Sequence, residues 1–196
     1  ITWMAAKKAK TEPTLLQQAK AGNAQAMFRL SLTLPDDAET SLWLRKAADK
    51  GVAPAQNNLG VMLAQGRATS PGSLWERLKG KLSRTNPDTG DAAAEAVHWY
   101  RQAAESVHGL AAFNLAYQLD VGQGVSADEK DAFQWYQIAA EEGIASAQCN
   151  LGAMYAQGRG TALDESIAVE WYTKAAAQGL ASAQYNLALM HHHGRG

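Results

Sequence analysis

The spacing of apolar positions predicts amphipathic helices along most of the chain, joined by glycine-containing turns. In the segment 168–176 apolar residues recur at i, i+3, i+4, i+7 and i+8, which is the spacing of one helical face. They are Ala168, Trp171, Tyr172, Ala175 and Ala176. The segment 145–157 also follows helical spacing, with a face that includes Leu151 and Met154. Together the two segments predict a pair of helices, each of which buries one face.

This helix pair is repeated with a period of 36 residues. Trp99, Trp135 and Trp171 lie 36 residues apart, and two further sets of residues keep the same interval. These sets are Asn114, Asn150 and Asn186, and Leu115, Leu151 and Leu187. Trp43 precedes Trp99 by 56 residues, which is one period plus an insertion of 20. Gly22 precedes Gly51 by 29 residues, so the first unit is shorter by 7. A unit of this kind cannot bury its apolar face alone, so the repeat predicts an all-α, right-handed α-solenoid of helix-turn-helix units.

The residue after the repeated leucine is small in every unit. The residues at this position are Ser31, Gly60, Ala116, Gly152 and Ala188. Glycine inside a helix costs about 1 kcal/mol relative to alanine. Gly60 and Gly152 therefore predict a helix crossing where no side chain fits. We also expect Trp135 to pack in the core between consecutive units.

Glycines mark the expected ends of the helices. Gly51, Gly143 and Gly179 each follow the repeated tryptophan by eight residues, where a helix end favours positive φ. Val107 occupies this position after Trp99, so either Val107 adopts a strained conformation or the helix end shifts to Gly109.

Three G-x-G tripeptides lie between the predicted helices, at 122–124, 158–160 and 194–196. A phosphate-binding loop would need a strand before it and a third glycine in register, and neither is present. We therefore interpret these tripeptides as interhelical turns.

The combined pattern resembles a known repeat family. The motif A-x-x-N-L-G-x-M-Y-x-x-G-x-G, followed by A-x-x-W-Y-x-x-A-A-x-x-G, is similar to the Sel-one-like repeats, which are relatives of the tetratricopeptide repeats. The first unit departs from this pattern, with Arg29 in place of asparagine and Leu44 in place of tyrosine.

The resemblance implies four units plus the start of a fifth. Residues 22–196 would form the solenoid with an insertion at about 68–90, and residues 1–21 would be an N-terminal helical cap or linker. It also implies a scaffolding, adaptor or regulatory binding role in a bacterium, and it favours the periplasm over the cytoplasm.

Composition narrows the class of function. The chain is 46% hydrophobic with a formal net charge of −1, which excludes a disordered polar chain and a strongly basic nucleic-acid binder. Alanine occurs 39 times but valine only 7 and isoleucine 4 times, which favours helices over sheets. No apolar run reaches the roughly 18–20 residues of a membrane span. Cys149, the single cysteine, cannot form an internal disulfide.

Catalytic or metal chemistry is not expected, and we predict no cofactor and no metal. The acidic pairs Asp36-Asp37 and Glu141-Glu142 lie at predicted helix ends, where charge at a helix end explains them. The side chains of His191–His193 point about 100° apart on a helix, so they cannot share one ion. A β-lactam-binding or β-lactam-hydrolysing enzyme is the alternative from another class. The members of the resembling family linked to that activity carry paired cysteines, which Cys149 alone does not provide.

The resemblance to tetratricopeptide architecture places the first helix of each unit on a concave groove. Carried over position by position, the candidate groove residues are Phe28, Arg29, Leu32, Asn57, Asn58, Val61, Phe113, Asn114, Tyr117, Cys149, Asn150, Ala153, Tyr185, Asn186 and Leu189. We call Asn58, Asn114, Asn150 and Asn186 the asparagine ladder. Their amides offer donors and an acceptor for the backbone of an extended peptide. In the alternative, these asparagines bond the neighbouring helix and only shape the solenoid.

The expected function is therefore a non-catalytic scaffold or adaptor that binds a peptide or protein in this groove. A periplasmic immunity protein that neutralises a bacterial toxin is the alternative that family analogy supplies.

The insertion is a second candidate surface. A capping box at Ser73 and Glu76 and apolar residues at helical spacing predict a short amphipathic helix with a charge of +3 over residues 74–84. Its candidate surface residues are Trp75, Arg77, Lys79, Lys81 and Arg84. Such a helix docks on an acidic partner or an anionic membrane surface, or it packs its tryptophan onto the solenoid.

The sequence stops at Gly196, where the second helix of a fifth unit would begin. We expect a longer natural protein, because Leu187 and Met190 would otherwise lack their covering helix. We also expect this end to self-associate or to fray.

Overall fold

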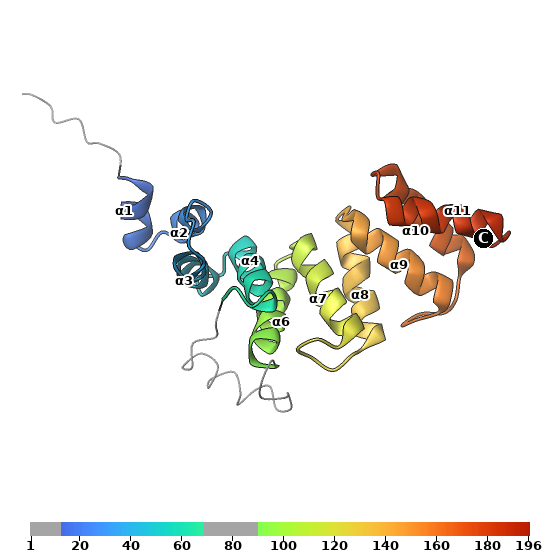
Figure 1. The fold of residues 1–196 in the computed structure, drawn as a ribbon, viewed down its shortest axis with the longest axis horizontal. Coiled ribbons are helices and arrows are strands. Elements are labelled where there is room, and N and C mark those ends of the chain that lie inside the picture. The colour runs from blue at the N-terminus through green and yellow to red at the C-terminus, as the bar shows by residue number, and fades with distance from the viewer. Residues whose placement is uncertain (1–12, 69–89) are drawn as a thin grey trace, which may run out of the picture.

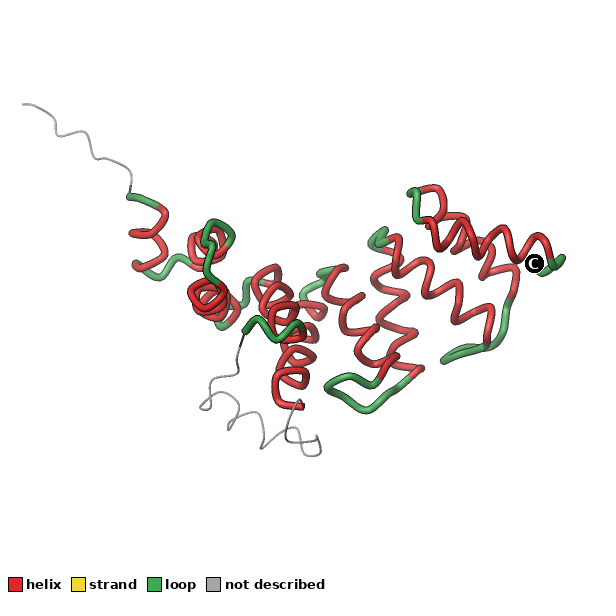
Figure 2. Tube along the Cα trace, in the orientation of Figure 1, coloured by secondary structure: helices red, strands yellow, loops and turns green. Residues whose placement is uncertain are grey.

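The computed structural model describes residues 13–68 and 90–196, and these residues form ten α-helices with no strand (Figures 1 and 2). The helices are α1 (Leu15–Lys20), α2 (Ala24–Ser31), α3 (Asp37–Ala48), α4 (Ala53–Ala64), α6 (Gly90–Glu105), α7 (Gly109–Val121), α8 (Glu129–Glu141), α9 (Ala145–Gln157), α10 (Glu165–Ala177) and α11 (Ala181–His192). Each described helix packs against the next one along the chain. They follow one another in a single elongated array (Figure 1). The predicted all-α solenoid is confirmed.

The described helices alternate between two roles. We call α2, α4, α7, α9 and α11 the first helices, and α3, α6, α8 and α10 the second helices. The pairs α2/α3, α4/α6, α7/α8 and α9/α10 correspond to the four repeats of the sequence, and α11 begins the next one.

In two units the small residue of the first helix lies under a ring from the second helix of the same unit. A Cβ atom added at Gly60 would lie 2.6 Å from the ring of Tyr100. A Cβ atom at Gly152 would lie 3.0 Å from the ring of Tyr172. The prediction of a crossing with no room for a side chain is confirmed at both glycines.

The tyrosine that follows Trp99, Trp135 or Trp171 is buried in each unit, and Trp99 is buried as well. Tyr100, Tyr136 and Tyr172 are 3%, 0% and 4% exposed. Trp135 and Trp171 are only half-buried, and the ammonium group of Lys174 lies 3.8 Å from the centre of the Trp171 ring. The core position expected for Trp135 is therefore filled by its neighbour Tyr136.

An ion pair also links successive second helices. The fully buried carboxylate of Glu95 on α6 accepts hydrogen bonds from Arg45 on α3 and from Nε1 of Trp99, the latter at 3.0 Å. One unit later, Arg101 and Asp131 pair at 3.4 Å at the equivalent positions. A buried carboxylate needs such partners because desolvation penalises its charge.

The G-x-G tripeptides at 122–124 and 158–160 lie in interhelical turns, as predicted, and the one at 194–196 follows the last described helix. All three also contact the preceding unit. The second glycine of each tripeptide contacts the start of the preceding second helix. A Cβ atom at Gly160 would lie 2.2 Å from the carbonyl oxygen of Glu129. In the second tripeptide the arginine between the glycines adds ion pairs, since Arg159 lies 2.6 Å from Asp120 and 3.7 Å from Glu129.

Val107 takes the first of the two conformations that the sequence allowed. Helix α6 ends at Glu105, and Val107 adopts a φ of 57°. This left-handed conformation costs a β-branched residue about 1–2 kcal/mol. The Val107 side chain is 67% exposed, so packing does not offset that cost.

We expect Gly160→Ala to destabilise the protein more than Gly179→Ala. Both glycines have positive φ, +66° and +86°, but a Cβ atom at Gly179 would meet nothing within 4 Å. Gly179→Ala should cost about 1 kcal/mol from backbone strain, and Gly160→Ala should cost about 1–3 kcal/mol more from the clash. Urea denaturation measures both. Equal losses would contradict the close approach of the turn to Glu129.

We expect Val107→Gly to raise the free energy of unfolding by about 1 kcal/mol, because glycine adopts positive φ without a Cβ penalty. Val121→Gly is the matched control, since Val121 is also exposed but is the last helical residue of α7. The control should lower the free energy of unfolding by about 0.5 kcal/mol or less. A loss of stability in Val107→Gly would show that Val107 is not strained.

Candidate functional site

The predicted groove residues lie on the first helices, but they differ in exposure. The asparagine ladder and the rings of Phe28 and Phe113 are half-buried. Arg29 on α2 is exposed, as are Tyr117 and Tyr185, whose side chains are 46% and 67% exposed. Of the predicted groove rings, those of Tyr117 and Tyr185 are thus the ones open to a partner.

The asparagine ladder makes contacts between neighbouring first helices. The Nδ2 atom of Asn114 on α7 donates to Oδ1 of Asn57 on α4 at 2.9 Å. Asn186 on α11 repeats this contact, with Nδ2 lying 3.8 Å from Sγ of Cys149 on α9. Asn57 and Cys149 occupy equivalent positions in their units. The asparagines therefore help to join the units, which gives physical support to their role in shaping the solenoid.

The contact made by the asparagine ladder differs between α7 and α9. Phe113 replaces the polar residue that Asn57 provides in α4, and its ring lies 6.0 Å from the ring of Tyr136. Burial raises the pKa of the Tyr136 phenol, and the side chain of Asn150 acts against that shift. Asn150 thus faces a buried ring of the preceding unit.

A cavity of about 200 Å³ opens between α2, α3 and α4. Its apolar lining residues are Leu32, Leu44, Val61 and Met62, and its polar lining residues are Ser31, Thr40, Asn58 and Arg67. Of the predicted groove residues, Leu32, Asn58 and Val61 line the cavity.

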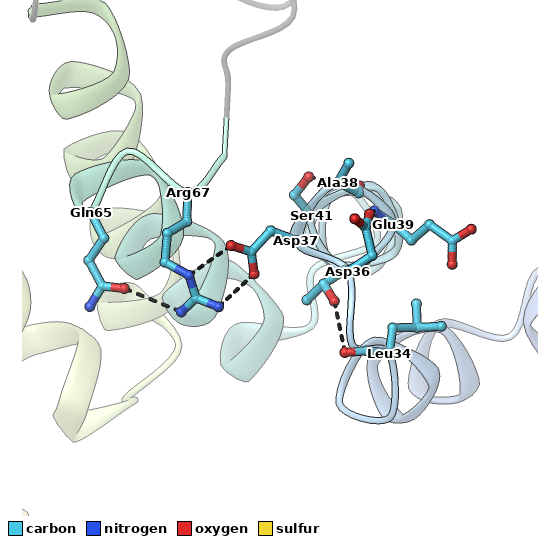
Figure 3. Close-up of polar contacts among 9 residues, drawn as sticks. Leu34, Asp36, Asp37, Ala38, Glu39, Ser41, Gln65 and Arg67 are labelled. Carbon is cyan, nitrogen blue, oxygen red and sulfur yellow. Dashed lines mark hydrogen bonds and ion pairs between the residues drawn. The ribbon is translucent and has the colours of Figure 1, made fainter.

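An ion pair at the cavity joins two units. The guanidinium of Arg67 donates to both carboxylate oxygens of Asp37, at 2.6 and 3.1 Å (Figure 3). These hydrogen bonds lower the pKa of Asp37. The hydroxyl of Thr40, which also lines the cavity, donates to the carbonyl of Leu34 at 3.4 Å. Arg67 is therefore held in place beside the cavity by a partner on α3.

Other predicted features give no further site. Trp75, Arg77, Lys79, Lys81 and Arg84 lie outside the described residues. Within residues 13–68 and 90–196, no cluster of three or more histidine, cysteine or acidic side chains is placed to hold a metal ion. His191–His193 are exposed, and the rings of His192 and His193 stack edge to face at 5.1 Å. None of the described helices combines the length and apolar composition that crossing a bilayer requires.

Sequence reasoning missed the cavity, although one signal was present. Ser31, Thr40, Met62 and Arg67 were not among the candidate residues. The repeat alignment contains the clue in Leu44, which stands where the later units have Tyr100, Tyr136 and Tyr172.

Comparison with known proteins identifies the repeat. The Sel1 repeat model matches residues 24–52, 53–72, 90–108, 109–144, 145–180 and 181–196. A protective antigen of uropathogenic Escherichia coli strains, described as displaying an SLR fold, is similar with a TM-score of 0.76 and 31% identity. The similarity covers 93% of this chain but 36% of that protein, so the chain spans about a third of its length.

A Sel1 repeat protein from Oxalobacter formigenes is similar with a TM-score of 0.73 and 30% identity. That similarity covers 90% of this chain and 67% of the other. No curated protein matches the chain.

Proposed function

Because the chain belongs to the Sel1 repeat family, we propose that it is a scaffold that binds a protein segment along the face formed by its first helices. Sel1 repeat proteins generally act as scaffolds for protein–protein interaction, and the family is generally non-catalytic. The finer statement, that binding occurs on this particular face, rests on the exposure of its side chains.

One repeated position carries the proposal. Leu32 directly after α2, Tyr117 on α7 and Leu189 on α11 occupy the same position of the repeat, and they are 61%, 46% and 42% exposed. Val61 on α4 and Ala153 on α9, at the same position, are half-buried. A role limited to packing would bury large apolar side chains at this position. Their exposure along one face supports a surface that is covered by a partner.

The asparagine ladder would contribute directional contacts beside these side chains. An asparagine amide has two donor hydrogens and a carbonyl oxygen. The contact of Asn114 with Asn57 uses one donor, so polar capacity remains for a peptide backbone. In this account the ladder has two roles, because it both joins the units and lines the binding face.

We predict that changing Tyr117 and Tyr185 together to alanine weakens partner binding by about 2 kcal/mol, because aromatic side chains dominate binding energy at interfaces. The free energy of unfolding should change by less than about 0.5 kcal/mol, since both rings are exposed. The partner is first identified by a photo-crosslinking residue at position 117, and affinity is then measured with the purified proteins.

The matched control changes Ile138 and Leu163 together to alanine. Ile138 is exposed on α8, and Leu163 is exposed in the turn before α10. The control should leave affinity unchanged. A loss of affinity in the control, with none in the tyrosine variant, would assign binding to the other side of the solenoid.

A second prediction tests the ladder. Changing Asn114 and Asn150 together to alanine should weaken binding of the same partner by about 1–3 kcal/mol through lost hydrogen bonds. Reduced stability with unchanged affinity would assign the asparagines to the solenoid alone.

A further inference from the structure

The cavity between α2, α3 and α4 lies where the other units hold a tyrosine ring. Leu44 is equivalent to Tyr100, Tyr136 and Tyr172, and Ser31 is equivalent to Gly60 and Gly152. In the later units the ring lies against that glycine, at 2.6 Å from a Cβ at Gly60 and at 3.0 Å from a Cβ at Gly152. In the first unit Leu44 and Ser31 instead both line the cavity.

The groups around the cavity match those around a tyrosine that is present. The side chains that act on the Tyr136 phenol are Asn150, Asp120, Arg159 and Tyr117. The equivalents of three of them line the cavity, and these are Asn58, Arg67 and Leu32. The equivalent of Asp120 is Pro35, which does not line it. Arg67 and Arg159 also make equivalent ion pairs, with Asp37 and Glu129 respectively. The cavity is therefore the unfilled counterpart of the Tyr136 site.

We propose that this cavity receives the side chain of a tyrosine from the bound protein segment. The inference rests on the proposed function, because it assigns a specific side chain to one end of the same face. Leu32 and Asn58 belong both to that face and to the cavity, so a segment on the first helices can reach it.

Size and polarity agree with a phenol. An apolar cavity of about 150 Å³ holds a benzene molecule, and this one has about 200 Å³. Leu44, Val61 and Met62 offer apolar contact to the ring. Asn58 and Arg67 supply hydrogen-bond donors for a phenolic oxygen.

The test uses p-cresol, which is the tyrosine side chain without its backbone, and toluene, which lacks the hydroxyl. Both are titrated into protein carrying ¹³C-labelled methionine methyl groups. Met62 lines the cavity, and Met154 occupies the equivalent position beside the filled Tyr136 site and serves as an internal control. We expect p-cresol to shift the Met62 signal with saturation at millimolar concentrations, and the Met154 signal to stay in place. Toluene should bind several-fold more weakly.

Leu44→Tyr supplies the missing ring from the protein itself. This variant should fold and lower p-cresol affinity at least about tenfold. Leu42→Tyr is the matched control, because it adds the same ring to the exposed side of α3. Val61→Phe is a second blocking variant, which fills the cavity from α4.

The absence of a saturable Met62 shift in the unmodified protein would overturn the proposal. Retained binding in both blocking variants would also overturn it. Equal affinity for toluene would overturn the assignment of the occupant as tyrosine.

A random peptide library displayed on phage separates this inference from the proposed function. Peptides selected on the unmodified protein should be enriched in tyrosine at one position, and selection on Leu44→Tyr should lose that enrichment. Selected peptides without a tyrosine preference would overturn the inference and leave the proposed function standing. Saturable p-cresol binding with no selected peptide would overturn the proposed function and leave the cavity assignment standing.

Discussion

The close approach of the two helices within each unit is the constraint on which the rest of the structure depends. In two units a ring of the second helix lies directly on a glycine of the first, as Tyr100 lies on Gly60 and Tyr172 on Gly152. Helix-interior glycine is unfavourable by about 1 kcal/mol relative to alanine, so packing of the ring has to offset that cost. The contact fixes the spacing of each pair, and the stacking of pairs then determines where the binding face and its cavity lie.

Contacts between units follow from this geometry. Once each pair is fixed, the turn after a first helix reaches the start of the preceding second helix, where Gly160 meets Glu129 and Arg159 pairs with Asp120. On the first helices, the hydrogen bond between Asn114 of α7 and Asn57 of α4 joins two successive units in the same way. In this account the asparagines both join the units and line the proposed binding face. The polar side chains of that face therefore recur with the period of the repeat.

The sequence predicted the helices, their pairing and the small residues at the crossing, because these depend on local spacing and on a repeated period. Which of the two adjacent aromatic residues is more deeply buried was not predictable in this way. Trp135 and Tyr136 are neighbours on one helix, and only the helix packed against them decides that Tyr136 is buried and Trp135 half-buried. The cavity was also missed, since the departure of Leu44 from tyrosine gains meaning only when the space around it is seen.

A double-mutant cycle between Gly60 and Tyr100 tests the central contact most directly. Gly60→Ala should destabilise the protein by about 2 kcal/mol, because the new Cβ would lie 2.6 Å from the Tyr100 ring. In a Tyr100→Leu background the same change should cost nothing or stabilise the helix by up to about 1 kcal/mol. The account therefore predicts a coupling energy of about 2 kcal/mol or more in urea denaturation. An equal cost of Gly60→Ala in both backgrounds would show that the ring does not set the approach of the helices.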